Sequence, residues 1–241
     1  MTQAPAHPIE LVVFDMAGTT VCDDGVVERA FQRAAERTGV ADRMPWADAL
    51  AYVRATMGQS KIDVFTALSG GDLRKAEEAT AAFEMAYGEI VAQGGVEEIP
   101  GASALMADLR EAGYRVALTT GFSPTTREAI LASLGWHDLV DVALSPIDAG
   151  RGRPAPDLVL TALLRTGTSA VDRVAVLGDT TSDVMSGRRA GAGIVAGVLT
   201  GAHGRDALLE AGADVVLNDV TEVRSLPAFS GLRAAPALHA G

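Results

Sequence analysis

The segment LVVFDMAGTTV (residues 11–21) begins with four apolar residues that run directly into an aspartate. The chain then continues through small residues, which favour a turn after the aspartate. A short, continuous apolar run that ends in this way is typical of a buried strand in a parallel sheet. We therefore predict a strand that presents Asp15 at its carboxyl end.

Similar apolar runs recur along the chain and predict the rest of the sheet. Most of them are continuous rather than alternating, as expected for strands covered on both faces. Amphipathic stretches separate them, and several of these end in glycine, a common helix stop. Alternating strands and helices predict an α/β fold, a Rossmann-like parallel sheet with crossover helices. The predicted strands are residues 11–15, 115–120, 140–145, 173–179, 193–199 and 213–217.

The interval between the first two predicted strands is longer than a crossover requires. Its residues form helical patterns such as GVVERAFQRAAERTG and DLRKAEEATAAFEMAYGEIVAQG, with no clear strand. We therefore predict two domains. A Rossmann-like core comprises residues 1–22 and 99–241, and a helical cap, residues 23–98, is inserted after the first strand.

The composition narrows the class of protein. The 241 residues are 48% hydrophobic, which is enough for a full core. The net charge of −11 argues against non-specific binding to nucleic acid or anionic membranes. No apolar run approaches the ~18 residues that span a bilayer, and the N-terminus lacks the basic start of a signal peptide. A single cysteine, Cys22, leaves no internal disulfide to form, so we expect a cytoplasmic protein.

Polar residues follow the predicted strands at the edge where open α/β sheets bind ligands. Asp15 ends the first strand, residues 119–121 end the second, and Asp179 ends a later one, with Asp183 shortly after it. Each of these also fits a helix cap or a turn when taken alone. Converging carboxylates repel one another unless a cation holds them, and such an oxygen-rich site suits Mg²⁺.

Four short motifs connect these strand ends, and together they resemble the haloacid dehalogenase-like superfamily of phosphoryl-transfer enzymes. The resemblance covers the whole Rossmann-like part in the right order. It implies that Asp15 attacks phosphorus and forms an aspartyl-phosphate. The motifs are DMAGTT (15–20), TTG (119–121), GRP (152–154) and GDTTSD (178–183).

The same resemblance implies roles for the other motif residues. Thr120 and the Gly121 amide would bind phosphate oxygens, and Arg153 would offset the phosphoryl charge, although Arg151 competes for that role. A bound metal would screen the repulsion between the anionic nucleophile and an anionic substrate. The implied Mg²⁺ ligands are Asp15, the backbone carbonyl of Ala17, Asp179 and Asp183.

Ala17 departs from the phosphatases of this superfamily, which carry a second aspartate there as general acid and base. A phosphate ester expels an alkoxide, so loss of that acid costs roughly 10²–10⁴-fold in rate. Cleavage of a carbon–phosphorus bond needs an electron sink instead, and a lysine imine on a neighbouring carbonyl supplies one. The chain has two lysines: Lys75 lies in a charged helical run, whereas Lys61 follows a glycine break inside the cap.

Three features resemble the phosphonoacetaldehyde hydrolases, the phosphonatase branch. They are the alanine two residues after Asp15, the sequence AGTT (17–20) and the cap sequence MGQSKID (57–63). In that branch the cap lysine, here Lys61, forms a Schiff base with an aldehyde, and the products are acetaldehyde and phosphate. The branch is commonly dimeric through the cap, which adds a homodimer to the expectations. The substrate-binding positions that the resemblance implies are Gly18, Met57, Thr119, Gly121 and Phe122.

Two positions depart from the phosphonatase pattern. Val64 replaces a histidine three residues after the lysine, and Phe122 replaces a tyrosine. The leading hypothesis is therefore a Mg²⁺-dependent hydrolase of a small carbonyl phosphonate that uses Lys61 as an imine former. The alternative is a phosphatase of small phosphate esters or anhydrides, in which Lys61 pairs with substrate charge. Asp179 with Asp183 argues against a metal-free dehalogenase, and Asp15 against a non-enzymatic binding protein.

Overall fold

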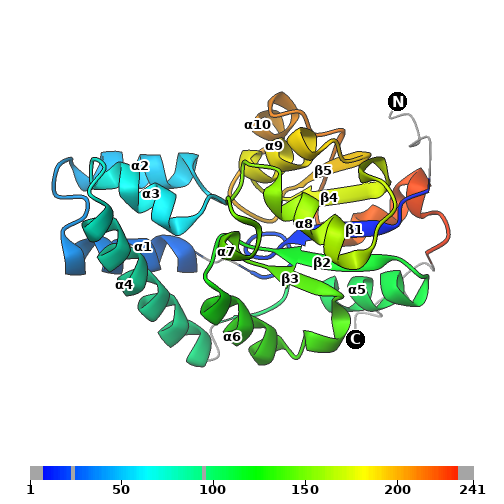
Figure 1. The fold of residues 1–241 in the computed structure, drawn as a ribbon, viewed down its shortest axis with the longest axis horizontal. Helices are drawn as coiled ribbons and strands as arrows, with labels where there is room; N and C mark the ends of the chain where they lie inside the picture. Colours follow the sequence, from blue (N-terminus) through cyan, green and yellow to red (C-terminus); the bar gives the residue numbers. More distant parts are fainter. Residues whose placement is uncertain (1–7, 23–24, 94–95, 233–241) are drawn as a thin grey trace, which may run out of the picture.

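The computed structural model describes residues 8–22, 25–93 and 96–232. Its centre is a six-stranded sheet in the order β3-β2-β1-β4-β5-β6, and every neighbouring pair is parallel (Figure 1). This sheet confirms the predicted α/β class and the Rossmann-like core. The strands are β1 (Leu11–Asp15), β2 (Arg115–Thr119), β3 (Val142–Leu144), β4 (Val174–Gly178), β5 (Ile194–Val198) and β6 (Val215–Leu217).

The two edge strands, β3 and β6, begin two residues later than predicted. Before β3, the carboxylate of Asp141 accepts a hydrogen bond from the Val116 amide at 2.8 Å. Before β6, the carboxylate of Asp214 accepts one from the Val195 amide, also at 2.8 Å. In both places a side chain satisfies a strand amide that a main-chain carbonyl would otherwise bind, which delays the start of the ladder.

Helices cover both faces of the sheet, which explains the continuous apolar runs. Val12 and Phe14 belong to one apolar cluster with residues of α5 and α6, and Leu11 and Val13 belong to a second with residues of α8, α9 and α10. The chain between β2 and β4 also forms the short α7. The bounds are α5 (Ala102–Glu111), α6 (Pro124–Leu134), α7 (Pro146–Ala149), α8 (Asp157–Thr166), α9 (Thr181–Ala190) and α10 (Arg205–Glu210).

Of the helices between β1 and β2 in the chain, the first four form a group to one side of the sheet (Figure 1). α1 and α3 both pack against the long α4. Phe31, Phe65 and Phe83 from these three helices form an aromatic cluster, with Phe31 centroids 4.9 and 4.8 Å from the other two rings. The bounds are α1 (Val26–Thr38), α2 (Trp46–Ala55), α3 (Lys61–Leu68) and α4 (Leu73–Ala92).

We propose that α1–α4 and their connections form the cap domain, residues 23–98, and that residues 1–22 and 99–241 form the core. Where the two meet, the two chain crossings lie side by side. The Cys22 amide donates to the Glu97 carbonyl and the Ile99 amide to the Thr20 carbonyl, both at 2.8 Å. Within the described ranges, every helix is too short or too polar to cross a membrane.

Candidate active site

The predicted site residues meet at the carboxyl ends of the central strands. β1 lies between β2 and β4, and Asp15 pairs in register with Thr119. Asp179 follows β4 directly, so its side chain and that of Asp15 emerge from neighbouring strands. The topology therefore brings the first, second and fourth motifs to one edge of the sheet, as predicted for an open α/β fold.

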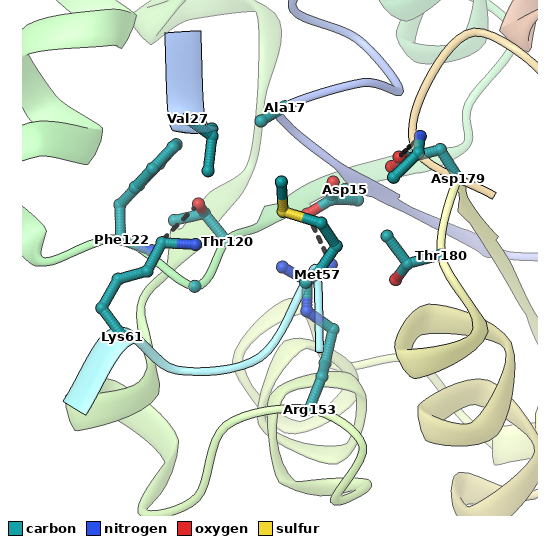
Figure 2. Close-up of a pocket in the computed structure, with 13 residues that line it drawn as sticks. Asp15, Ala17, Val27, Met57, Lys61, Thr120, Phe122, Arg153, Asp179 and Thr180 are labelled. Carbon is teal, nitrogen blue, oxygen red and sulfur yellow. Dashed lines mark hydrogen bonds and ion pairs between the residues drawn. The ribbon is translucent and has the colours of Figure 1, made fainter. Parts of the chain in front are cut away.

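A small cavity lies at this edge, between the strand ends and the cap segment 57–61 (Figure 2). Its volume is about 30 Å³, which is room for a water molecule or two. Three predicted site residues, Gly18, Thr119 and Asp183, are not among the residues that line it. Nine predicted residues do: Asp15, Ala17, Met57, Lys61, Thr120, Gly121, Phe122, Arg153 and Asp179.

The three predicted carboxylate ligands are all buried. Asp15, Asp179 and Asp183 are at most 4% exposed, and each offers one oxygen within 4.8 Å of the other two. Such an all-oxygen donor set fits Mg²⁺. A Cβ at Gly18, whose φ is +83°, would lie 2.6 Å from an Asp179 oxygen, so the glycine leaves the space that this carboxylate fills.

Asp179 is held from two sides. Its Oδ1 accepts a hydrogen bond from the Thr19 hydroxyl at 3.0 Å, and its Oδ2 accepts one from the Ala202 amide at 2.8 Å. Burial nevertheless raises the pKa of the Asp179 carboxyl to about 7, and the charge of Asp15 acts in the same direction. Loss of water around a carboxylate disfavours its charged form more than these two hydrogen bonds favour it.

This raised pKa predicts how the chelated protein responds to pH. Native Asp179 keeps its proton up to about pH 7, whereas the unfolded chain releases it near 3.8, so this group lowers the free energy of unfolding as pH rises through that interval. About three pKa units correspond to an effect on the order of 4 kcal/mol. We therefore compare the free energy of unfolding of Asp179→Asn with that of the wild type, both in EDTA. From pH 5 to pH 7 the value for the wild type should fall relative to the value for the variant, which lacks the titrating carboxyl.

Magnesium should reverse this trend in the wild type, because the metal binds the charged carboxylate. Added Mg²⁺ should therefore raise the melting temperature more at pH 8 than at pH 5, where a proton competes with the metal. Parallel pH curves for wild type and Asp179→Asn in EDTA would contradict the assignment.

Arg153 is the arginine of the third motif that reaches the site. Its Nη1 lies 2.5 Å from Asp15 Oδ1 and also contacts Asp183 Oδ1. Among the described atoms, its buried Nε has no hydrogen-bond partner, which leaves an N–H for a further oxygen. Arg151 lies outside the cavity, where it is exposed and pairs with both oxygens of Asp157 at 2.9 and 2.8 Å. The structure therefore brings Arg153, and not Arg151, to Asp15.

Asp183 lies behind Arg153 in the first turn of α9. It forms a capping box with Thr180: its Oδ2 accepts from the Thr180 amide at 3.1 Å and from the Thr180 hydroxyl at 2.5 Å. The other oxygen contacts Arg153. Asp183 thus both helps to cap the start of α9 and contacts the guanidinium, and its predicted role as a metal ligand stays a prediction.

The loop after β2 supplies hydrogen-bonding groups on the opposite side of the cavity. The Thr120 hydroxyl accepts a hydrogen bond from the Phe122 amide at 3.2 Å. Thr119 is turned away, and its hydroxyl donates to the Phe14 carbonyl at 3.4 Å. Gly18 likewise lies behind the site, where its carbonyl accepts from the Thr200 hydroxyl at 2.6 Å.

Three glycines let the cap segment 57–61 approach the core closely. A Cβ at Gly58 would lie 2.5 Å from Thr180 Oγ1, and one at Gly121 would lie 2.6 Å from the Gln59 carbonyl oxygen. A Cβ at Gly152 would lie 2.9 Å from Ser60 Cβ. These distances are too short for a side chain at any of the three positions, so each glycine lets its own backbone contact the facing domain directly.

Lys61 is the first residue of α3 and points into the cavity (Figure 2). It is 6% exposed, and its Nζ lies 5.1 Å from the ring centroid of Phe122, 5.3 Å from Phe31 and 5.4 Å from Phe83. The core residue Phe122 thus completes an aromatic surrounding that two cap residues begin. Burial among apolar groups is the setting in which lysines act as amine nucleophiles.

The positions that depart from the phosphonatase pattern are both buried. Val64 belongs to the apolar cluster that also contains Val12 and Phe14, and Phe122 packs on Tyr87 of α4 with ring centroids 4.4 Å apart. The described histidines lie elsewhere: His137 is exposed on the core, and His203 accepts a hydrogen bond from the Thr181 amide at 2.8 Å. His7 and His239 fall outside the described residues.

Four further residues line the cavity that the sequence analysis did not select: Val27, Gly58, Thr180 and Ala202. Thr180 and Gly58 stand inside the quoted motifs GDTTSD and MGQSKID, so their positions carried a signal. Ala202 contributes only its backbone amide, and Val27 only apolar surface, so neither side chain marks a site.

Comparison with known proteins agrees with this geometry. The family model of haloacid dehalogenase-like hydrolases matches residues 9–191. A probable phosphatase IndB of Dickeya dadantii is 29% identical over 217 residues, 88% of this chain and 91% of that protein. A phosphonoacetaldehyde hydrolase of Bordetella pertussis is 30% identical over 211 residues, with 80% and 74% covered.

A solved structure shows the same fold. A phosphonoacetaldehyde hydrolase-like protein from Oleispira antarctica superposes with a TM-score of 0.78, at 22% identity, over 97% of this chain and all of that one.

Proposed function

This chain belongs to the haloacid dehalogenase-like hydrolases, and on that basis we propose that it cleaves the carbon–phosphorus bond of a small carbonyl phosphonate. The proposed substrate is phosphonoacetaldehyde and the products are acetaldehyde and phosphate. One observation carries the proposal: a buried lysine and the nucleophilic aspartate line the same cavity, where Ala17 stands in place of a general acid.

In the proposed reaction the Lys61 amine condenses with the substrate carbonyl and releases water, which forms an imine. An Asp15 carboxylate oxygen then attacks phosphorus. The carbon–phosphorus bond breaks, and its electron pair moves into the imine to form an enamine. Protonation of the enamine and hydrolysis of the imine free the aldehyde and Lys61, and a second water releases phosphate from Asp15.

The other residues bind and orient the phosphoryl group. We assign Thr120, the Gly121 amide and Arg153 to its oxygens, and Met57 and Phe122 to the wall around the carbonyl end. Gly18 and Thr119 support the site from behind. Mg²⁺ held by Asp15, Asp179, the Ala17 carbonyl and Asp183 would neutralise charge between nucleophile and substrate.

A second candidate is a phosphatase of small esters or anhydrides. Two observations favour it. Val64 and Phe122 stand where the phosphonatase pattern has a histidine and a tyrosine, and relatives such as the IndB protein are named phosphatases. In that case the Lys61 ammonium would pair with substrate charge, which needs no imine.

One experiment tests the leading proposal. The purified protein is mixed with Mg²⁺ and phosphonoacetaldehyde, treated with borohydride and analysed by peptide mass spectrometry, alongside a free-phosphate assay. We expect a reduced adduct on Lys61 together with released phosphate. Phosphate release without an adduct would exclude the imine, and the absence of both would exclude this substrate.

Three other expectations stay predictions. The sequence predicts a cytoplasmic location and no partner among nucleic acids or membranes, and the resemblance to phosphonatases implies a homodimer through the cap.

A further inference from the structure

Glu84 of the cap helix α4 forms hydrogen bonds with the first turn of the core helix α6. Its Oε1 accepts from the Ser123 amide at 3.0 Å, and its Oε2 accepts from the Ser123 hydroxyl at 2.5 Å. Oε2 also accepts a hydrogen bond from the Thr126 hydroxyl. Both oxygens of one cap carboxylate are therefore bound by the core.

The start of α6 is a favourable place for a carboxylate. Ser123 is the N-cap residue, and its hydroxyl oxygen accepts from the Thr126 amide at 3.3 Å. The amides of a helix N-terminus carry a partial positive charge that attracts anions. Hydrogen bonds to an ionised acceptor are also stronger than neutral ones.

These hydrogen bonds adjoin the loop that carries the proposed phosphate-binding groups. Ser123 directly follows Phe122, which packs on Tyr87 and Phe83 of the same cap helix at 4.4 and 6.1 Å. Phe122 is also one of the three rings around the Lys61 amine. A short segment of core backbone, residues 120–123, is thus held to the cap at two successive residues.

The contact is also placed so that it can open. Glu84 is half-buried and lines a cleft of about 260 Å³ between cap and core, together with Lys61, Gly121 and Phe122. Water that enters this cleft can replace the Ser123 and Thr126 donors. The cavity of about 30 Å³ beside Asp15 holds little more than water, so we expect cap and core to separate when an organic phosphonate enters.

We propose that Glu84 is a closure latch: by binding Ser123 and Thr126 it holds the cap on the core and keeps residues 120–122 at their closed distance from Lys61. Glu84 is in this sense a positioning residue, and the expected effect on turnover rests on the proposed function. The effect on cap closure itself does not.

Hydrogen exchange tests the latch without any turnover. Four proteins, wild type, Glu84→Gln, Thr126→Val and the double variant, are compared in Mg²⁺ with inorganic phosphate, with Glu77→Gln, an exposed residue of α4, as matched control. We expect about tenfold faster amide exchange in residues 57–61 and 120–127 for both single variants. The double variant should exchange more slowly than the two single effects combined predict, because both substitutions act on the same Glu84–Thr126 hydrogen bond.

Steady-state kinetics on the turned-over substrate form the second arm. Glu84→Gln should lower kcat/KM by about 10- to 100-fold, while its melting temperature stays close to that of Glu77→Gln. Exchange and kinetics equal to those of Glu77→Gln would overturn the latch, and so would exchange effects that add in the double variant. If Glu84→Gln does not fold, Thr126→Val decides alone. If the variants exchange faster but the wild type cleaves no phosphonate, the result would support the role of Glu84 in cap closure and refute the proposed function.

Discussion

Asparagine in place of Asp15 is expected to reduce turnover by roughly 10⁴-fold or more, the range seen when a covalent nucleophile is removed. The amide keeps the shape of the carboxylate but cannot attack phosphorus. The site should otherwise persist, because Arg153 retains its contact with Asp183. The pKa of Asp179 should fall, because the charge of Asp15 contributes to raising it.

Phosphate release with Mg²⁺ measures this effect, and Asp138→Asn, at an exposed position of the core, is the matched control. Rapid quenching of the wild type should also trap a phosphoryl group on the peptide that contains Asp15. Residual activity above about 1% of wild type in Asp15→Asn would refute the aspartyl-phosphate route, because no covalent mechanism tolerates loss of its nucleophile so well.

Arginine in place of Lys61 separates the two candidate functions. An arginine keeps a positive charge but cannot form an imine, because its guanidinium does not lose its proton in proteins. If the protein cleaves carbon–phosphorus bonds, we expect Lys61→Arg to lose about 10³-fold or more in turnover and all of the borohydride adduct.

The second lysine of the chain supplies the control for this experiment. Lys75 lies in the first turn of α4, outside the residues that line the cavity, so Lys75→Arg should keep both activity and adduct. If Lys61→Arg instead keeps a tenth or more of wild-type turnover on phosphate esters, charge pairing is sufficient and the phosphatase candidate holds. Fluorescence or circular dichroism must show an intact fold, because the larger side chain enters a cluster of three aromatic rings.

The sheet could be predicted from sequence because burial on both faces leaves a continuous apolar run for each strand. The largest errors in where a strand begins, two residues each, fell at the two edge strands, where Asp141 and Asp214 bind strand amides with their side chains. An aspartate beside an apolar run is a common sequence feature, and only the neighbouring strand shows that it replaces a backbone carbonyl.

The candidate site was predictable where a motif fixes a residue to a strand end, as for Asp15 and Asp179. The choice between Arg151 and Arg153 was not, because two residues of separation place one in the cavity and the other beside Asp157 in solvent. Glu84 carried no signal at all. A single glutamate in an amphipathic helix commonly faces solvent, and the partners of Glu84 lie about forty residues along the chain.

The backbone contact between cap and core also constrains how this protein can diverge. At Gly58, Gly121 and Gly152 the cap and the core lie too close for a Cβ atom, and no residue is smaller than glycine. Mutation at these positions can only push the parts apart, so no point change there enlarges the cavity while it stays closed. A lineage that adopts a bulkier substrate must therefore remodel the cap, by length or sequence changes outside these glycines, while the chemistry at the strand ends is inherited unchanged.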